Sequence, residues 1–351
     1  VTGVQTCALP ILVLCRHHGP RRLTHSYAAI VVTHFGGPLL EECLASLRAQ
    51  TLPFAEILVV VSRDSALPVS APALQLGENV GYARAANIGI AATEGHPLLL
   101  NDDTRLDPDC LAALNAAFTG NGVFLPRIEL VGGGMDNVGH GLFPDGAVWA
   151  RGRGAPAGPV PGVPGGFSGA AVLFARETWS ALGGFDGRFG SFGEDVDLSL
   201  RLLRRGVPLT VVEDAVVHHH LGASFGRTSP EKLRAIERNR VRAAVRSLPL
   251  TALLTLPAWT FGRYALFFAL ASAGRGPGGD VPSESRRAAL RGALEGLRDA
   301  PAWWIERRRD RDAWALGELE MWHALWVRRA RWEDVARENA APAPSRPVTN
   351  P

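Results

Sequence analysis

Cysteine is scarce in this chain of 351 residues: it has four, at positions 7, 15, 43 and 110, and no two of them have C-x-x-C spacing. We therefore expect neither a zinc site nor a disulfide framework, and a reducing compartment fits best. Charged residues make up only 20% of the chain and hydrophobic residues 46%, which excludes a disordered chain. The 39 glycines and 25 prolines have no triplet period, which excludes a collagen-like chain. The length suits one large α/β domain with an appendage, or two modest domains.

Lysine is nearly absent, since all but one of the 37 basic residues are arginines. Residues 1–225 have 15 basic and 20 acidic residues, a net charge of −5, whereas residues 226–351 have 22 and 14, a net charge of +8. Seven of the nine tryptophans also lie in the second part. This contrast predicts different roles for the two parts.

The N-terminal segment has no initiator methionine, and its first residues, VTGVQTCALPI (1–11), look like the in-frame translation of a sequencing-library adapter. We treat residues 1–25 as an adapter-like artefact and uncertain leader. A degenerate signal peptide is the alternative, but no charged region precedes the short apolar run at 8–14.

From Ser26 onward, apolar runs of strand length alternate with segments of helical periodicity. Strands are predicted at 27–33, 56–61, about 74–76, 97–100, 209–212 and 215–220, and helices at 38–49, about 83–93, from about 178, and up to about 203. This alternation predicts a parallel, doubly wound α/β sheet whose ligands bind at the carboxyl ends of the strands. Between 132 and 166 the chain becomes rich in Gly and Pro, which favours a long surface loop or lid over a site.

Two acidic clusters and one histidine cluster indicate chemistry. Asn101-Asp102-Asp103 follows an apolar strand, where oxygen ligands suit Mg²⁺ or Mn²⁺ bridging a substrate diphosphate. Taken alone, such a motif is more often a helix cap or a solvated turn.

The second cluster is Glu194-Asp195-Val196-Asp197. One or two acids satisfy the first turn of a helix and further like charges repel, so one of the three acids is predicted to be a base. The third cluster is 218–220, three histidines at the end of an apolar strand. A neutral imidazole there could bind a metal or a phosphate, and a structural role is the alternative.

Together, these clusters and their surroundings resemble the inverting family 2 glycosyltransferases of the GT-A fold, particularly bacterial rhamnosyltransferase-like members. About 200 residues match in the right order, and the matching segments are IVVT (30–33), P-L-L-x-E-C-L-x-S-L-x-x-Q-T (38–51), NVGYA (79–83) with Asn87 and Gly89, LLNDDT (99–104), FSGA (167–170), GGFD (183–186), GEDVDL (193–198) and VHH (217–219). The resemblance implies a GT-A, Rossmann-like mixed sheet flanked by helices over residues 26–225.

The resemblance also implies roles for single residues. Asp195 is the general base that takes the proton of an acceptor hydroxyl, and Glu194 beside it shapes its pKa or binds the acceptor. Asp103 holds the divalent metal, Mg²⁺ or Mn²⁺, helped by His218 or His219, against the leaving diphosphate. The other expected substrate-binding residues are Thr33, Asp64, Asn79, Gly81, Arg84, Asn87, Asn101, Asp102, Ser168, Gly169 and Asp197.

One segment departs from the family pattern. The family usually has Asp-Asn-x-Ser-x-Asp after the second strand, and its first acid recognises the base, whereas this chain has Val61 at that place. Either Asp64, on a shifted turn, or backbone groups would then recognise a uracil or thymine. The sequence therefore does not identify the donor nucleotide.

The second part of the chain, 226–339, is predicted to be a helical, basic, Trp-rich region that associates with membranes, followed by a disordered tail at 340–351. Residues 248–274 are long enough to span a bilayer, but two prolines, a glycine and an arginine interrupt them. We expect an in-plane helix or re-entrant pair, with a true span and ordinary core packing as alternatives. The Arg and Trp clusters that follow suit an anionic membrane surface. Nucleic acid is not an expected partner, because no recognised binding module accompanies them.

The sequence thus predicts a hexosyltransferase at the cytoplasmic face of the bacterial inner membrane, peripheral or monotopic. It would move a sugar from a nucleotide-sugar donor, dTDP-rhamnose or a UDP-sugar, to a cell-surface glycan or lipid-linked acceptor. A nucleotidyltransferase of similar fold is one alternative, but THFGG (33–37) lacks the basic residue of a phosphate loop. A non-catalytic glycan-binding or scaffold subunit of a polysaccharide assembly complex is another.

Overall fold

The computed structural model describes residues 25–220, 229–273 and 281–337. The predicted leader, except for His25, and the predicted tail at 340–351 lie outside the described residues, as does the last residue of the apolar segment 248–274.

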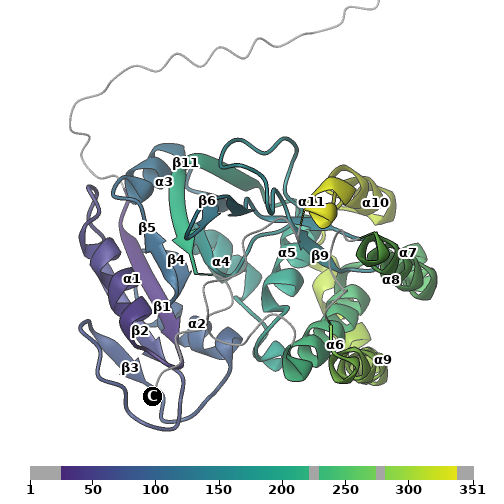
Figure 1. Ribbon diagram of the computed structural model, residues 1–351. Helices are drawn as coiled ribbons and strands as arrows, with labels where there is room; N and C mark the ends of the chain where they lie inside the picture. Colours follow the sequence, from purple (N-terminus) through teal and green to yellow (C-terminus); the bar gives the residue numbers. More distant parts are fainter. Residues whose placement is uncertain (1–24, 221–228, 274–280, 338–351) are drawn as a thin grey trace, which may run out of the picture.

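A mixed sheet of nine strands forms the centre of the molecule (Figure 1). Its order is β3 (Ala73–Gln75), β2 (Glu56–Val61), β1 (Tyr27–Thr33), β4 (His96–Asn101), β10 (Ala171–Phe174), β6 (Val123–Leu130), β11 (Leu209–His219) and β5 (Thr104–Leu106), with β7 (Met135–Asn137) paired to β6. Strands β3, β2, β1 and β4 are parallel, whereas β10 runs antiparallel to both of its neighbours. The mixed sheet implied by the family resemblance is confirmed, and the wholly parallel sheet expected from the alternation is wrong.

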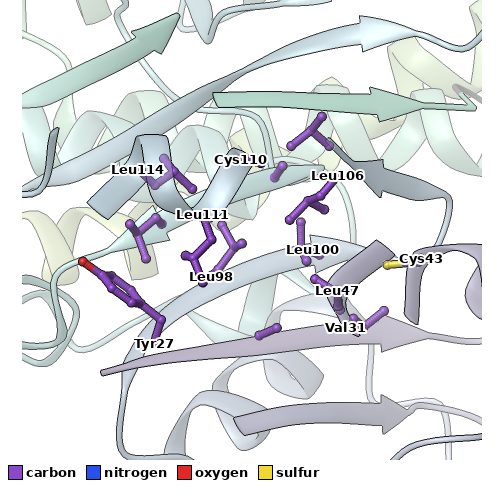
Figure 2. Packing of buried hydrophobic residues seen from close by; sticks show 14 of the residues in the cluster. Tyr27, Val31, Cys43, Leu47, Leu98, Leu100, Leu106, Cys110, Leu111 and Leu114 are labelled. Carbon is purple, nitrogen blue, oxygen red and sulfur yellow. The ribbon is translucent and has the colours of Figure 1, made fainter. Parts of the chain in front are cut away.

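Helices cover both faces of the sheet, and the alternation of side chains along β1 shows why. Its odd-numbered residues pack against α1 (Pro38–Arg48) and α3 (Cys110–Ala117), in the cluster that Figure 2 shows. Its even-numbered residues pack against α2 (Tyr82–Ala91), α4 (Arg176–Leu182) and α5 (Glu194–Arg204). Every residue of β1 is therefore buried, as in parallel sheets covered on both faces.

Two predicted segments form one strand. The runs 209–212 and 215–220 belong to β11, which ends one residue before the second run does, and the pairing of β11 with β6 shifts register between Val212 and Val216. Glu213 and Asp214 occupy this irregularity, and such a bulge lets polar residues interrupt an apolar strand without ending it.

The Gly- and Pro-rich segment 132–166 is not a plain surface loop, contrary to expectation. It contains β7, β8 (His140–Leu142) and β9 (Val148–Ala150). The buried guanidinium of Arg151 donates hydrogen bonds to the carbonyl oxygens of residues 138, 160, 161 and 162. This side chain supplies donors that a Pro-rich backbone lacks, so the segment folds back on itself.

The rest of the described chain is helical: α6 (Pro230–Ser247), α7 (Leu250–Leu254), α8 (Leu256–Ser272), α9 (Ser283–Asp310), α10 (Glu318–Val327) and α11 (Trp332–Ala336), with short 3₁₀ turns at Gly187–Phe189 and Arg311–Ala313. Helices α6 and α9 pack closely, because Gly292 and Gly296 leave room for the α6 backbone. A third apolar cluster joins α5, α6 and α10 through Leu200, Ala243 and Met321. The helical region is thereby attached to the helix that carries the acidic cluster.

None of the helices in the described ranges has the length and apolar content needed to cross a bilayer. The apolar segment at 248–274 forms α7 and α8. Ala252 and Leu256 are buried in the third cluster, whereas Phe261 and Phe268 are exposed. The in-plane helix stays a prediction.

Candidate active site

A cavity of about 2020 Å³ opens where the sheet meets α5, and all three chemical clusters of the sequence contribute to its wall. The β4–β5 turn places Asp102 and Asp103 there, the N-terminus of α5 places Glu194 and Asp195, and the end of β11 places His219. Ligands of open α/β sheets bind beyond the carboxyl ends of the strands, which is the position of this cavity.

Asp102 is held by the end of β1. The Thr33 hydroxyl donates to Oδ2 of Asp102 at 2.5 Å, and the Gly36 backbone N–H donates to the same hydroxyl oxygen at 2.9 Å. Burial raises the pKa of Asp102 to about 6, and the nearby charge of Asp103 adds to the effect. This carboxyl therefore changes charge at a higher pH than an exposed aspartate.

His219 lies between two carboxylates. Its Nε2 is 3.3 Å from Oδ1 of Asp103, and its Nδ1 is 2.8 Å from Oδ2 of Asp136, whose other oxygen is 2.9 Å from Arg153. Burial favours a neutral imidazole, but the two carboxylates outweigh it and raise the pKa of His219 to about 10. Burial alone would raise the pKa of Asp103 and of Asp136, because it disfavours a charged carboxylate. Their cationic neighbours prevail, so the pKa of Asp103 lies below its ordinary value and that of Asp136 is about 2.

The residues around Asp103 fit a divalent cation. Oδ1 of Asp103 is buried and lies 3.3 Å from Nε2 of His219, but no side chain or backbone group of the described residues donates a hydrogen bond of good geometry to it. A carboxylate oxygen is the donor that Mg²⁺ and Mn²⁺ prefer, and His219 could bind the ion once it had lost its proton. In the described ranges, no group of three or more His, Cys, Asp or Glu side chains is arranged to hold a metal. A bound ion would therefore take several ligands from diphosphate and water, as Mg²⁺ usually does.

Asp195 and Glu194 begin α5 but have different surroundings. Half-buried Asp195 accepts from the backbone N–H of Val196 at 2.8 Å and of Gly169 at 3.4 Å. Glu194 is 6% exposed, and its Oε2 has no hydrogen-bond partner among the described residues. Burial and the charge of Asp195 raise the pKa of Glu194 well above its ordinary value. Burial thus favours the protonated form of Glu194, whereas Asp195 has backbone N–H donors and a helix N-terminus beside its carboxylate oxygens.

The turn before these acids has a left-handed backbone. Phe192 has φ of 69° and Gly193 has φ of 96°, and a side chain as bulky as phenylalanine rarely adopts such a conformation. Buried Asn239 of α6 donates to the carbonyl oxygens of Phe189 at 2.9 Å and Phe192 at 2.6 Å. Helix α6 therefore holds the strained turn that presents the acidic pair.

The structure brings ten of the predicted site residues together and leaves six outside. The residues that line the cavity are Thr33, Asn79, Asn101, Asp102, Asp103, Ser168, Gly169, Glu194, Asp195 and His219. Those that do not line it are Asp64, Gly81, Arg84, Asn87, Asp197 and His218.

Four of the residues outside the cavity have contacts that explain their positions. His218 points to the other face of β11, where its Nε2 lies 2.9 Å from Oδ1 of Asp107. The Asn87 amide bonds both the N–H and the carbonyl oxygen of Phe185. Arg84 packs on Gly187, and Gly81 lets the start of α2 approach the backbone of Gly190. The metal and nucleotide roles expected for these four residues stay predictions.

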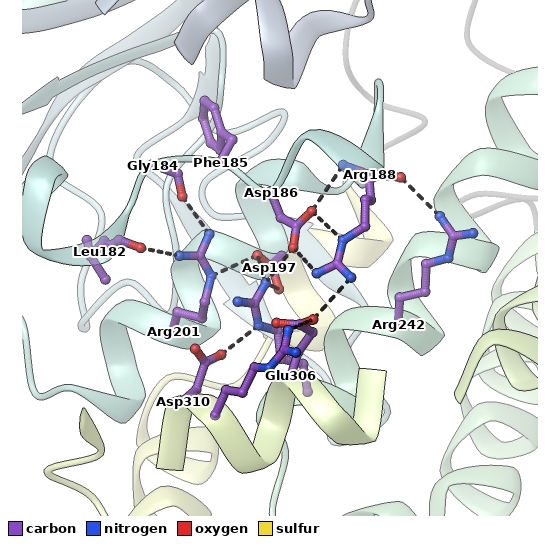
Figure 3. Close-up of polar contacts among 12 residues, drawn as sticks. Leu182, Gly184, Phe185, Asp186, Arg188, Asp197, Arg201, Arg242, Glu306 and Asp310 are labelled. Atoms are coloured by element: carbon purple, nitrogen blue, oxygen red, sulfur yellow. Dashed lines mark hydrogen bonds and ion pairs between the residues drawn. The ribbon is translucent and has the colours of Figure 1, made fainter. Parts of the chain in front are cut away.

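Asp197 is fully buried in a network of charged side chains (Figure 3). Its Oδ2 lies 2.8 Å from Nε of Arg201 and 3.3 Å from Nη1 of Arg246. Asp197 thus joins α5 to α6 and does not line the cavity, and its expected substrate contact stays a prediction. Asp64 is exposed in the loop after β2, and base recognition stays open.

Two residues of the site had no role in the sequence prediction. Asp136 lies in the Gly- and Pro-rich segment, and no local pattern marks it. Tyr82 lines the cavity and donates its hydroxyl proton to the Gly169 carbonyl oxygen at 2.8 Å. Its place within NVGYA was the only signal for it.

Two family models and several known proteins match this chain. The family model described as Glycosyl transferase family 2 matches residues 28–155, and that described as Glycosyl transferase family group 2 matches residues 98–272. An N-acetylglucosaminyl-diphospho-decaprenol L-rhamnosyltransferase of Mycobacterium tuberculosis is 30% identical over 251 residues, which cover 61% of this chain and 82% of that protein. An uncharacterized protein of the same species is 34% identical over 167 residues, 43% of this chain and 56% of its own length.

Among solved structures, GalNAc-T7 with UDP, GalNAc and Mn²⁺ has a TM-score of 0.53 at 15% identity, over 80% of this chain and 56% of that one. The chain thus spans little more than half the length of GalNAc-T7 and of the uncharacterized relative. The structural likeness supports the GT-A fold, and the match over most of the rhamnosyltransferase goes further: the chain belongs to glycosyltransferase family 2.

Proposed function

We propose that this protein is an inverting glycosyltransferase that moves a sugar from a nucleotide-sugar donor to a hydroxyl of a lipid-linked or cell-surface glycan acceptor. One observation carries the proposal: an acid suited to hold a metal, Asp103, and an acid suited to accept a proton, Asp195, line one cavity. The reaction needs both functions at one place.

Each residue of the site has a separate role in this reaction. Asp195 accepts the proton of the acceptor hydroxyl while that oxygen bonds to the anomeric carbon. The bond from that carbon to the diphosphate breaks on the opposite face, so the configuration inverts and the nucleoside diphosphate leaves. A divalent ion held by Asp103 and His219 would supply positive charge against the leaving diphosphate. Protonated Glu194 donates a hydrogen bond to the acceptor and stays neutral beside Asp195.

Names of related proteins support the substrate classes. The rhamnosyltransferase acts on a lipid-linked sugar, and the GalNAc-T7 structure contains UDP and Mn²⁺. We therefore propose dTDP-rhamnose or a UDP-sugar as donor, Mg²⁺ or Mn²⁺ as cofactor, and a lipid-linked acceptor. A place at the cytoplasmic face of the inner membrane is part of the same proposal, since such acceptors are membrane-bound.

Isothermal titration of the full chain with UDP, dTDP and GDP, each with Mn²⁺ and with EDTA, tests the donor site. We expect metal-dependent binding of one nucleotide, lost in Asp103→Ala. In Asp195→Asn we expect the same nucleotide affinity without sugar transfer, because the base acts after binding. If wild-type protein bound none of the nucleotides, or if Asp195→Asn transferred sugar at the wild-type rate, the proposal would be wrong.

A further inference from the structure

The cavity of the candidate active site extends along α6, α8 and α9, where its lining becomes apolar. Ile236 of α6, Phe261, Phe267 and Phe268 of α8, and Leu290 and Leu297 of α9 line this part, which we call the apolar arm. These helices lie on the side of the molecule away from β2 and β3 (Figure 1). The polar residues at the strand ends line the same cavity.

The apolar arm is exposed to a degree that folding alone does not explain. Phe261 is 76% exposed, Phe268 75%, Leu290 64% and Leu297 54%. Single exposed apolar side chains are ordinary, but a group of them in one cavity marks a binding surface. Covering these side chains with hydrocarbon is favourable, whereas sugar hydroxyls or phosphates placed against them would lose hydrogen bonds to water.

The volume of the cavity also exceeds what a donor requires. Sites for drug-sized ligands measure about 300–1000 Å³, and this cavity measures about 2020 Å³. A nucleotide-sugar at the strand ends would leave much of the space empty. A further ligand is therefore expected in the remainder, and the lining there selects an apolar one.

Charged side chains beside the apolar arm are paired and give the wall a fixed shape. Arg240 donates to Glu237 at 2.8 Å, and Arg263 donates to Asp145 at 2.8 Å and to Glu237 at 3.1 Å. All four residues are at most 8% exposed. The network attaches α8 to α6 and to the turn between β8 and β9. The two arginines and two acids of this network balance one another in charge.

We propose that the apolar arm binds the hydrocarbon chain of a lipid-linked acceptor whose sugar hydroxyl reaches Asp195. This inference rests on the proposed function, because it places the acceptor of that reaction. One cavity joins the polar acids to the apolar arm, which matches a molecule with a sugar at one end and a long hydrocarbon at the other. Binding of a bilayer surface or a second protein to the apolar arm would not explain why the arm and the acids line one cavity.

Prenyl diphosphates of two chain lengths are the probes for this proposal. Dimethylallyl and geranylgeranyl diphosphate are titrated into the full chain, each below its micelle concentration. We expect the longer probe to bind at least about tenfold more tightly, because it buries more hydrocarbon. In the double variant Phe261→Gln/Leu290→Gln the preference should shrink toward unity. These side chains are exposed, so folding should not suffer. Leu319→Gln is the matched control, because Leu319 is 84% exposed on α10 and lies outside the cavity.

Equal affinity of the two probes would overturn the proposal, as would an equal loss of preference in Leu319→Gln. Sedimentation with phosphatidylglycerol vesicles supplies another contrast: if the double variant lost vesicle binding but kept the chain-length preference, the arm would be a membrane-contact surface and the proposal would fall. Nucleotide binding with Mn²⁺ should be unchanged in the double variant. A wild-type protein that prefers the long probe but binds no nucleotide would contradict the proposed function and not the lipid site.

Discussion

Oδ2 of Asp136 lies 2.8 Å from Nδ1 of His219, and the opposite nitrogen of the same imidazole lies 3.3 Å from Asp103. An acid from β7 thus fixes the ring that faces the candidate metal-binding acid. Such outer partners set the orientation and proton of a ligand imidazole, and their loss typically costs about 10- to 100-fold in metal affinity or activity. The arrangement gives Asp136 a positioning role.

Replacement of Asp136 by asparagine tests this role. We expect the Mn²⁺ concentration needed for half-maximal nucleotide binding to rise by about 10- to 100-fold, with the nucleotide affinity at saturating Mn²⁺ changing less. Asp107→Asn is the control, because Asp107 pairs with His218 on the other face of β11 at 2.9 Å. An unchanged Mn²⁺ titration in Asp136→Asn would show that His219 does not depend on this acid.

Asp102 predicts a pH-dependent stability in metal-free protein. Burial raises its folded-state pKa to about 6, from an ordinary value of 3.8. A raised pKa means that the contribution of Asp102 to stability is present below pH 3.8 and is lost as the pH rises through about 6. Asp102→Asn avoids burying a charge, so the variant should match wild type near pH 4 and exceed it above pH 6, by up to about 3 kcal/mol.

Urea unfolding in EDTA at several pH values measures this difference. Asp64→Asn removes an exposed acid from the loop after β2 and should give the wild-type curve at each pH. If Asp102→Asn differed from wild type by the same amount at pH 4 and pH 8, the cause would not be the ionisation of Asp102.

The sequence allowed the position of the site to be predicted better than the role of each residue. The β-branched runs at 27–33 and 56–61 match β1 and β2 residue for residue, because strands buried on both faces need continuous apolar runs. The carboxyl ends of these strands, together with the acidic and histidine motifs, predicted where the cavity lies. The choice between His218 and His219 could not be made, since it depends on the phase of β11 around its bulge.

Other roles depended on distant contacts. Asp136 enters the site through the folding of residues 132–166, which needs the buried guanidinium of Arg151. Asp197 had one local signal, the spacing of four residues to Arg201 on the same helix, which is typical of an ion pair. Its second partner, Arg246, lies on α6 and is 49 residues away in the sequence.

We expect Asp197 to stabilise the fold through its buried ion pairs with Arg201 and Arg246. Asp197→Asn leaves Arg201 and Arg246 in the interior with less compensating charge, and breaking a buried pair costs about 3–5 kcal/mol. We expect a loss of that order in the free energy of unfolding, measured with urea, while the donor affinity of the folded fraction stays unchanged. Arg309→Ala removes an exposed pair with Glu306 and should change stability by less than about 1 kcal/mol. A weakened donor affinity with normal stability would instead support the substrate-binding role predicted for Asp197.

Two helical glycines predict opposite effects of the same substitution. A Cβ at Gly292 of α9 would overlap the backbone of Arg234 in α6, whereas a Cβ at Gly262 of α8 meets no atom within 4 Å. Gly292→Ala must push α9 away from α6, and we expect a loss of about 1–3 kcal/mol. Gly262→Ala should stabilise by up to about 1 kcal/mol, because alanine favours the helix without a clash. Thermal unfolding of both variants measures the difference. Equal effects would mean that α6 and α9 do not pack as closely as the glycines allow.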